Sequence, residues 1–137
     1  MKFRPSGFDI EWRGVFENSE VNALHAECFE HGISASNWWL RANHFSLGWV
    51  CVREARTLVG FVNVAWDGEA HAFILDTMVP PAFQRRGIAR ALMVEAVDRA
   101  ERAGCEWVHV DFEPHLQSFY FDACGFKPTH AGLIALR

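Results

Sequence analysis

Residues 73–103 constrain the fold most, because they join two different hydrophobic periods across one short turn. An apolar run rich in β-propensity stops at two prolines, and a helical period begins at Ile88. The apolar positions that follow recur three or four residues apart: Ala89, Leu92, Met93, Ala96, Val97, Ala100 and Ala103. Gly104 then provides a C-terminal stop. The sequence predicts a strand, a turn at Gly87 and a long amphipathic helix.

Three arginines, Arg85, Arg86 and Arg90, lie around the start of this helix. A helix N-terminus carries partial positive charge and leaves backbone N–H groups without partners, so cations there are locally unfavourable. An anion across the turn would reverse the sign, since N–H groups and guanidinium groups both bind phosphate oxygens. Gly87 would let the backbone approach such an anion closely. We expect a phosphate-binding turn; the structural alternative is a solvated basic turn.

A short signature follows a Val-x-Pro strand end and reads Gln84-Arg85-Arg86-Gly87-Ile88-Ala89. It resembles the Gln/Arg-x-x-Gly-x-Gly/Ala signature of the GCN5-related N-acetyltransferases. The sequence of this turn is similar to that of the ribosomal-protein alanine acetyltransferases, which also have Phe-Gln-Arg-Arg-Gly here. The strand before it, the long helix after it and a C-terminal Cys-Gly-Phe extend the resemblance over most of the chain.

The resemblance implies an α/β (α+β) fold: a mixed, mostly antiparallel central sheet with helices on both faces and a central parallel β-α-β step. It also implies that the two central parallel strands splay and that the thioester arm of acetyl-CoA lies between them. The strand end would bind the pantetheine arm and the turn the pyrophosphate: Thr77, Met78 and Val79 by their backbone, then Gln84, Arg85, Arg86, Gly87, Ile88, Ala89 and Arg90. An ordinary buried strand is the alternative for residues 77–79.

Length and composition indicate one compact domain over residues 1–137, with 50% of the residues hydrophobic. Thirteen basic and seventeen acidic residues give a net charge of −4, which argues against nucleic-acid binding and mildly favours a cationic partner. The four cysteines are scattered in apolar patterns and predict buried thiols of a cytoplasmic protein: Cys28, Cys51, Cys105 and Cys124. No apolar run approaches the about 20 residues of a membrane span, so we expect no membrane partner.

Hydrophobic periods and turn signals predict the remaining elements. Strands are expected at residues 8–16, 48–53, 58–66, 70–79, 107–112 and 132–136. One helix should start at a cap on Asn18 or Ser19 and end before Gly32, and a second should start at Ser34 or Ser36. A short helix is expected at 116–124, and the last strand could pair across a homodimer.

Acyl transfer from a thioester to an amine needs a neutral amine, a donor for the carbonyl and a proton for the leaving thiolate. Many relatives use a tyrosine four residues before the glycine of the final Gly-Phe as the acid, but here that position is Phe121. Tyr120 stands one residue earlier, which rotates it by about 100° on a helix. Either Tyr120 reaches the sulfur, or it caps the core and water or Cys124 lies there instead. Pro114 also replaces an asparagine of many relatives.

The candidate bases lie on the strand before that helix. His109 and Asp111 share one strand face, and His109 occupies the place that resembles the acidic base of the ribosomal-protein enzymes. An imidazole titrates in the useful range. A core histidine satisfied by a carboxylate is the structural alternative. Three other groups are rival bases: Asp76, Glu113 and His115.

Two further motifs favour structure over chemistry. His25, Cys28 and His31 are spaced three residues apart, so on a helix they fan through more than half a turn and should not converge on one ion. We therefore expect no metal. Trp38 and Trp39 either pack in the core or form a wall of the acceptor pocket.

These observations favour an acetyl-CoA-dependent N-acetyltransferase. The acceptor would be a primary amine of a small molecule or of a peptide or protein N-terminus, attacking directly in a ternary complex. Tyr120 would be the acid and His109 or Asp111 the base. Phe121 motivates one alternative, a non-catalytic acyl-CoA-binding module, and exposed tryptophans motivate another, a protein-interaction domain.

Overall fold

The computed structural model describes residues 4–137. In chain order the elements are strand β1 (Asp9–Trp12), helices α1 (Asn18–Cys28) and α2 (Trp38–Phe45), strands β2 (Ser46–Glu54), β3 (Thr57–Trp66) and β4 (His71–Met78), the turn η1 (Pro81–Phe83), helix α3 (Ile88–Arg102), strand β5 (Trp107–His109), the 3-10 turn η2 (Pro114–Leu116) and a short π-helix, η3 (Ser118–Ala123). No helix in residues 4–137 is long and apolar enough to cross a membrane.

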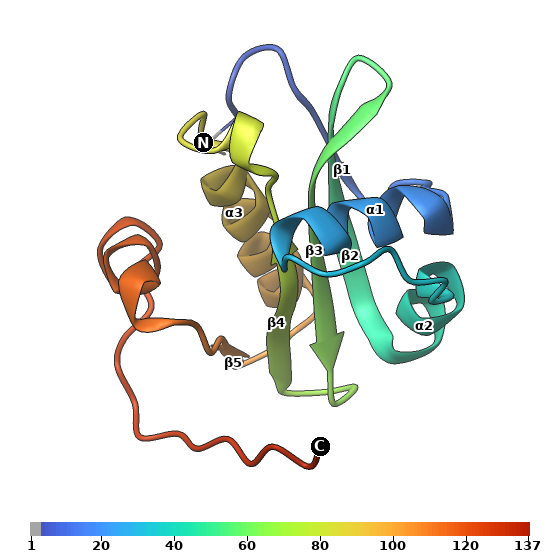
Figure 1. Ribbon diagram of the computed structural model, residues 1–137. Coiled ribbons are helices and arrows are strands. Elements are labelled where there is room, and N and C mark those ends of the chain that lie inside the picture. The colour runs from blue at the N-terminus through green and yellow to red at the C-terminus, as the bar shows by residue number, and fades with distance from the viewer. Residues whose placement is uncertain (1–3) are drawn as a thin grey trace.

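The strands form one five-stranded sheet in the order β1-β2-β3-β4-β5 (Figure 1). Strands β1 to β4 pair antiparallel, whereas β4 and β5 pair parallel. Helix α3 makes the crossover between β4 and β5, as the connection between parallel strands requires. The predicted mixed sheet with one parallel β-α-β step is therefore confirmed.

Successive side chains of β2 and β3 point to opposite faces of the sheet, which divides the core between the two faces. Val50 and Val62 belong to a buried cluster with Leu92 of α3. Trp49 and Phe61, on the opposite face, belong to a second cluster with residues of α1 and α2. Figure 1 shows α3 on one side of the sheet and α1 and α2 on the other. Both faces are covered, which explains why neither strand alternates cleanly between apolar and polar residues.

The first two helices begin at other residues than their sequence predicted. Glu17 precedes α1, and its N–H donates to the Glu20 carboxylate at 2.9 Å. Asn37 precedes α2, and its side-chain oxygen accepts the Leu40 N–H at 3.0 Å. The predicted cap Asn18 instead accepts the Trp39 N–H at 2.8 Å. The prediction of caps at 18 or 19 and at 34 or 36 was wrong; the side chains of Asn18 and Ser34 bond instead to Trp39 and Asn22, which are distant in sequence.

The C-terminal elements also differ from the predictions. Strand β5 ends at His109 rather than at residue 112, and the predicted helix at 116–124 is divided into η2 and η3. Residues 132–136 form no strand, and Leu133, Ile134 and Leu136 are 84–90% exposed. In Figure 1 the segment after β5 leaves the body of the molecule. The apolar pattern alone therefore did not make a strand, because no described strand lies beside it to complete a ladder.

Candidate active site

Strand β4 contains a β-bulge near its C-terminal end, ahead of the predicted phosphate-binding segment. Asn63 pairs with Leu75 and Phe61 with Met78, so a two-residue step on β3 faces a three-residue step on β4. Asp76 lies in the bulge with a φ of 57°, which is uncommon for a residue other than glycine. Bulges re-aim side chains and are frequent next to active sites. The bulge brings Asp76 into hydrogen-bonding contact with the Asn63 side chain.

Strands β4 and β5 separate immediately before the bulge. Their parallel ladder has its last pair at Phe73 and His109, whereas β4 continues to Met78. The edge of β4 that contains Thr77 therefore has no ladder partner on the β5 side within the described chain. This arrangement agrees with the splay that the family resemblance implied. It leaves backbone N–H and C=O groups available for another polar chain.

Tyr120 lies at this gap and reaches β4. Its hydroxyl hydrogen-bonds the Thr77 side chain, and its ring stacks on Phe112 at a centroid distance of 4.5 Å. Burial raises the pKa of Tyr120, partly offset by the bond to Thr77, so the phenol remains protonated at neutral pH. Phe121, in contrast, packs edge-on against Phe112 at 5.2 Å. Of the two aromatic side chains, the structure therefore brings Tyr120 to the strand.

The π-helical geometry of η3 explains why this residue reaches β4. The Cys124 N–H donates to the carbonyl of Phe119, five residues back, at 3.0 Å. A π turn is wider than an α turn and thus changes the direction of each side chain, and such turns are frequent at functional sites. Pro114 begins the preceding 3-10 turn η2. Burial raises the pKa of the Cys124 thiol, and Arg90 opposes that effect.

The turn before α3 has the backbone that the sequence predicted. Gly87 immediately precedes the helix with a φ of 85°, and Arg85 has a φ of 62°. Ile88 then packs against β3 at Gly60, where an added Cβ would lie 2.6 Å from the Ile88 side chain. This close approach fixes the helix start against the sheet. The first N–H groups of a 15-residue helix thus point out of an exposed, glycine-containing turn.

The residues of the predicted phosphate site are not equivalent in the structure. Arg85 and Arg90 are exposed. Arg86 pairs with Glu54 at 3.0 Å and lies over the rings of Phe8 and Phe83, so it ties the turn to neighbouring elements. Because Arg86 is engaged by these partners, Arg85 is better placed than Arg86 to meet an anion.

The end of β4 is already held by neighbouring side chains. The Gln84 side-chain amide donates to the Val79 carbonyl at 3.3 Å, and the Cys28 thiol also hydrogen-bonds the Val79 backbone. Met78 is fully buried and belongs to the cluster under α1 and α2. Thr77 is half-buried and holds Tyr120. The predicted pantetheine-binding segment, residues 77–79, thus contacts side chains from α1, from the turn and from η3.

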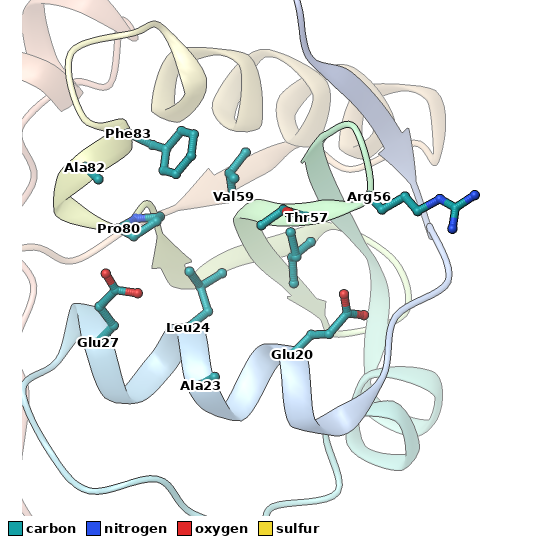
Figure 2. A pocket seen from close by; sticks show the side chains of 11 residues that line it. Glu20, Ala23, Leu24, Glu27, Arg56, Thr57, Val59, Pro80, Ala82 and Phe83 are labelled. Atoms are coloured by element: carbon teal, nitrogen blue, oxygen red, sulfur yellow. The ribbon is translucent and has the colours of Figure 1, made fainter.

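A cavity of about 420 Å³ lies between α1 and the turn at Pro80. Figure 2 shows Glu20 and Glu27 rising toward it from α1, with Phe83 above and Arg56 directed away. Two carboxylates on its rim disfavour phosphate.

A second cavity, of about 380 Å³, lies on the face of the sheet that α2 covers only in part. Its walls combine apolar and polar groups: Arg41, Phe45, Ser46, Asn63, Ala65, Leu75 and Asp76. Burial raises the pKa of Asp76, while Arg41, His25 and Asn63 each act in the opposite direction. The Arg41 guanidinium lies 3.9 Å from the Asp76 carboxylate and 3.8 Å above the Trp38 ring. We call this cavity the Asp76 cavity, after the carboxylate among its lining residues.

The predicted base His109 lies elsewhere. Its Nε2 is 2.7 Å from Nδ1 of His71, and its ring stacks on Phe73 at 4.7 Å. Since Thr77 comes four positions after Phe73 in the strand, His109 lies about 13 Å along β4 from the Tyr120 contact. Asp111 is exposed and close enough to affect the pKa of Tyr120. Glu113 and His115 are exposed near η2.

Two of the three residues spaced along α1, His25 and His31, meet at the end of the helix. Nδ1 of His25 lies 2.6 Å from Nε2 of His31. Helical spacing does not apply to this pair, because α1 ends at Cys28 and the chain folds back. Burial raises the pKa of the Cys28 thiol to about 11, so it is no thiolate at neutral pH. Within residues 4–137 no group of three or more potential metal ligands occurs.

Other predictions for side chains are partly confirmed. Trp38 is buried in the core, whereas Trp39 is 39% exposed. Cys51 is buried, but the other three cysteines are only half-buried. Asn63 was not among the predicted site residues, although a single amide in the apolar run of β3 was the available signal. Arg41 was not predicted either, because its contact with Asp76 depends on tertiary structure and left no signal in the sequence.

Comparison with known proteins gives the family. Residues 12–126 match the model of the acetyltransferase (GNAT) family. The chain belongs to this family. GCN5-related N-acetyltransferase 1, a chloroplastic protein of Arabidopsis thaliana, is 31% identical over 75 residues, which are 55% of this chain and 38% of that protein. The chain therefore spans well under half the length of this relative.

Solved structures share the fold over nearly the whole chain. A probable acetyltransferase from meticillin-resistant Staphylococcus aureus has a TM-score of 0.79 with 16% identity, covering 95% of this chain and 98% of that chain. Aminoglycoside N-acetyltransferase AAC(6')-Iy, solved in complex with CoA, has a TM-score of 0.73 with 18% identity, covering 98% and 97%. The predicted fold class is thus confirmed.

Proposed function

We propose that this protein is an acetyl-CoA-dependent N-acetyltransferase that transfers the acetyl group to a primary amine by direct attack in a ternary complex. One observation carries the proposal: the open edge of β4 joins the turn at Gly87, the Tyr120 hydroxyl and the Asp76 cavity. A cofactor site, a proton donor and an acceptor cavity are therefore contiguous along one strand end.

The described residues fit acetyl-CoA. The N–H groups after Gly87, with Arg85 and Arg90, would bind its diphosphate, because they combine helix-dipole and guanidinium charge. The unpaired edge of β4 at Thr77 would bind the amide-bearing arm. When bound, acetyl-CoA supplies the activated acyl group as a thioester.

Two side chains would handle the protons. Tyr120 is protonated at neutral pH and lies at the open strand edge, so it can protonate a leaving thiolate. Asp76 is the base that we favour among the candidates, because it lines the acceptor cavity and burial increases its basicity. His109 pairs with His71 at the other end of β4, and Asp111 is exposed. The latter two stay in the proposal as weaker alternatives.

The cavity supports an acceptor with an apolar body and an amine. Phe45 and Leu75 supply apolar surface, and Asp76 supplies the only carboxylate among its lining residues in the described chain. A cationic amine would be attracted to that carboxylate and would compete with Arg41, which lines the same cavity 3.9 Å from Asp76. Both a small-molecule amine and a peptide N-terminus have these features.

The cofactor assignment can be tested by calorimetry of CoA binding to matched glycine variants. Gly87→Leu should weaken CoA binding at least 10-fold, because a side chain at the turn blocks the approach of phosphate. Gly68→Leu is the control: Gly68 has a similar φ of 87° but lies in the β3–β4 hairpin, distant from the turn. CoA affinity that is equal in both variants would contradict the assignment. Release of free CoA thiol with a panel of primary amines tests turnover.

A second candidate function is a non-catalytic acyl-CoA-binding module. It is motivated by Phe121 at the usual acid position and by the Tyr120 hydroxyl already bound to Thr77. This function predicts tight CoA binding, no thiol release with any amine and no effect of Tyr120→Phe on CoA affinity. Thiol release with one amine of the panel excludes it.

A further inference from the structure

The Asp76 cavity contains two opposite charges that do not saturate each other. Arg41 and Asp76 both line it, and the nearest nitrogen and oxygen of their side chains lie 3.9 Å apart. This separation exceeds the about 2.7–3.2 Å of a hydrogen bond, so both groups keep hydrogen-bonding capacity for a ligand. The side chains are 47% and 26% exposed, and solvated pairs of this kind contribute little to stability. Both charges can therefore take a new partner at small cost.

Each of the two charges is held in position by a neighbour. The Arg41 guanidinium lies 3.8 Å above the centre of the ring of Trp38, which is buried in the core. Stacking leaves the N–H groups at the edge of the guanidinium plane free to donate. The Ser46 hydroxyl donates to Oδ1 of Asn63 at 2.5 Å, so the amide nitrogen of Asn63 is the atom that donates to Asp76. The cavity thus presents a fixed cation and a fixed carboxylate side by side.

A simple amine matches only one of these charges. Its ammonium group would bind Asp76 but would lie beside the like charge of Arg41. An α-amino acid matches both, because its ammonium and carboxylate groups are attached to one carbon and lie about 3 Å apart. With the pair that is 3.9 Å apart in the cavity, the four charges alternate in sign around a ring. A peptide N-terminus lacks this match, because the carbonyl beside its amine belongs to an amide.

The other walls of the cavity favour an apolar side chain. Phe45 is 71% exposed and Leu75 is 40% exposed, so a ligand that covers them removes apolar surface from water. Among the lining residues in the described chain, only Arg41 and Asp76 are charged. The volume of about 380 Å³ lies at the lower end of the roughly 300–1,000 Å³ of small-molecule sites. This size suits a molecule as small as one amino acid.

We propose that the acceptor is a free α-amino acid with an apolar side chain, whose carboxylate binds Arg41 and whose ammonium binds Asp76. The inference rests on the proposed function. Asp76 takes one proton from the ammonium, the freed nitrogen bonds to the acetyl carbonyl carbon, and the carbon–sulfur bond of the thioester breaks. Tyr120 protonates the sulfur, and the second proton lost by the amine replaces the one that Tyr120 gave. The N-acetyl product has no positive charge, so its attraction to Asp76 is lost and it can leave.

Three acceptors with the same side chain test the proposal: L-leucine, L-leucinamide and 3-methylbutylamine, of which only the first has a carboxylate. Release of CoA thiol from acetyl-CoA is measured with each acceptor in the unaltered protein, Arg41→Gln and Arg41→Lys. Arg13→Gln is the control, because Arg13 also lies over a tryptophan, Trp49 at 4.8 Å, but lines neither cavity. The three amines differ in basicity, so each is compared with itself between proteins, where this difference cancels.

Arg41→Gln should lower kcat/KM for L-leucine by about 10–100-fold, mainly through KM, because charge-assisted hydrogen bonds to the carboxylate are lost. The same variant should raise kcat/KM for 3-methylbutylamine and L-leucinamide, because it removes a competitor for Asp76. Arg41→Lys keeps the charge without the planar fork and should give an intermediate loss with L-leucine. Arg13→Gln should change none of the three values. An equal fall with all three acceptors in Arg41→Gln would show that Arg41 only maintains the structure, and would overturn the proposal.

Calorimetry of L-leucine binding to the CoA-saturated protein gives a readout that does not need turnover. L-leucine should bind at least 10-fold more tightly than 4-methylpentanoate, which lacks the amine, and Arg41→Gln should remove most of this binding without changing CoA affinity. Turnover of 3-methylbutylamine or L-leucinamide but not of L-leucine would overturn the amino-acid acceptor and leave the proposed function intact. Absence of thiol release with all three acceptors, despite CoA binding, would overturn the proposed function and this inference with it.

Discussion

Strand β4 separates two regions of the molecule that are stabilised in different ways. On its β3 side lie three antiparallel strands, covered on both faces by helices and buried aromatic and aliphatic side chains. On its β5 side the ladder has three residue pairs, followed by η2, η3 and an exposed C-terminal segment. Figure 1 shows this contrast between the body and the segment that leaves it.

The difference indicates where stability and chemistry reside. The body contains the buried side chains that offset the entropy of folding. The boundary at β4 contains the positive-φ Asp76, the open strand edge and the single buried residue of η3, Tyr120. Substitutions in the body should therefore change stability, and substitutions at the boundary should change activity.

The largest effect should come from Asp76→Asn. An amide cannot take the amine proton, so kcat/KM should fall by about 10²–10⁴-fold. The melting temperature should change little, because the amide keeps the shape and a polar contact with Asn63. Kinetics and thermal unfolding measured on one preparation check both statements. A large loss of stability with an unchanged rate would place Asp76 among the structural residues.

The next effect compares the body with the exposed segment. Phe61→Ala should lower the free energy of unfolding by about 3–5 kcal/mol, because it leaves a cavity among fully buried rings. Leu136→Ala, at a side chain that is 90% exposed, should change it by less than about 0.5 kcal/mol. Denaturant unfolding measures both. Similar losses would show that the C-terminal segment is packed in solution.

Tyr120→Phe should have an intermediate effect. The variant loses one hydrogen bond to Thr77, worth about 1 kcal/mol of stability. Loss of the proton donor should lower kcat about 100-fold with little change in CoA affinity. Phe121→Leu is the matched control, since it alters the neighbouring ring without removing a hydroxyl. If both variants have equal rates, the phenol is not the acid.

The smallest effect concerns the ion pair between α1 and β2. Glu20 and Arg53 lie 2.7 Å apart, and the hydrogen bond from Arg53 lowers the pKa of Glu20 despite partial burial. A carboxyl group with a lowered pKa stabilises the fold at pH values above its unfolded-state pKa of about 4.3. This stabilisation is lost as the pH falls through the pKa of the folded state. Glu20→Gln should cost about 1 kcal/mol at pH 7 and nothing near pH 2. Unfolding at both pH values measures the difference.

Local sequence determined the central strand, turn and helix. Ile88 begins α3 as its period predicted, and Gly87 has the positive φ that only glycine adopts readily. Periodicity and glycine chemistry act within a few residues, so the sequence alone specifies them. The mixed sheet and its parallel step were also predicted correctly, from the resemblance of the turn to the family signature.

Tertiary structure decided the rest of the site. Asp76 enters the Asp76 cavity because a bulge shifts the register of β4, and Tyr120 reaches Thr77 because η3 winds as a π-helix. His25 and His31 meet because the chain folds back after α1. Each outcome depends on contacts between elements distant in sequence. The order of residues therefore determined where the turn at Gly87 would form, and packing decided which side chains would lie beside the end of β4.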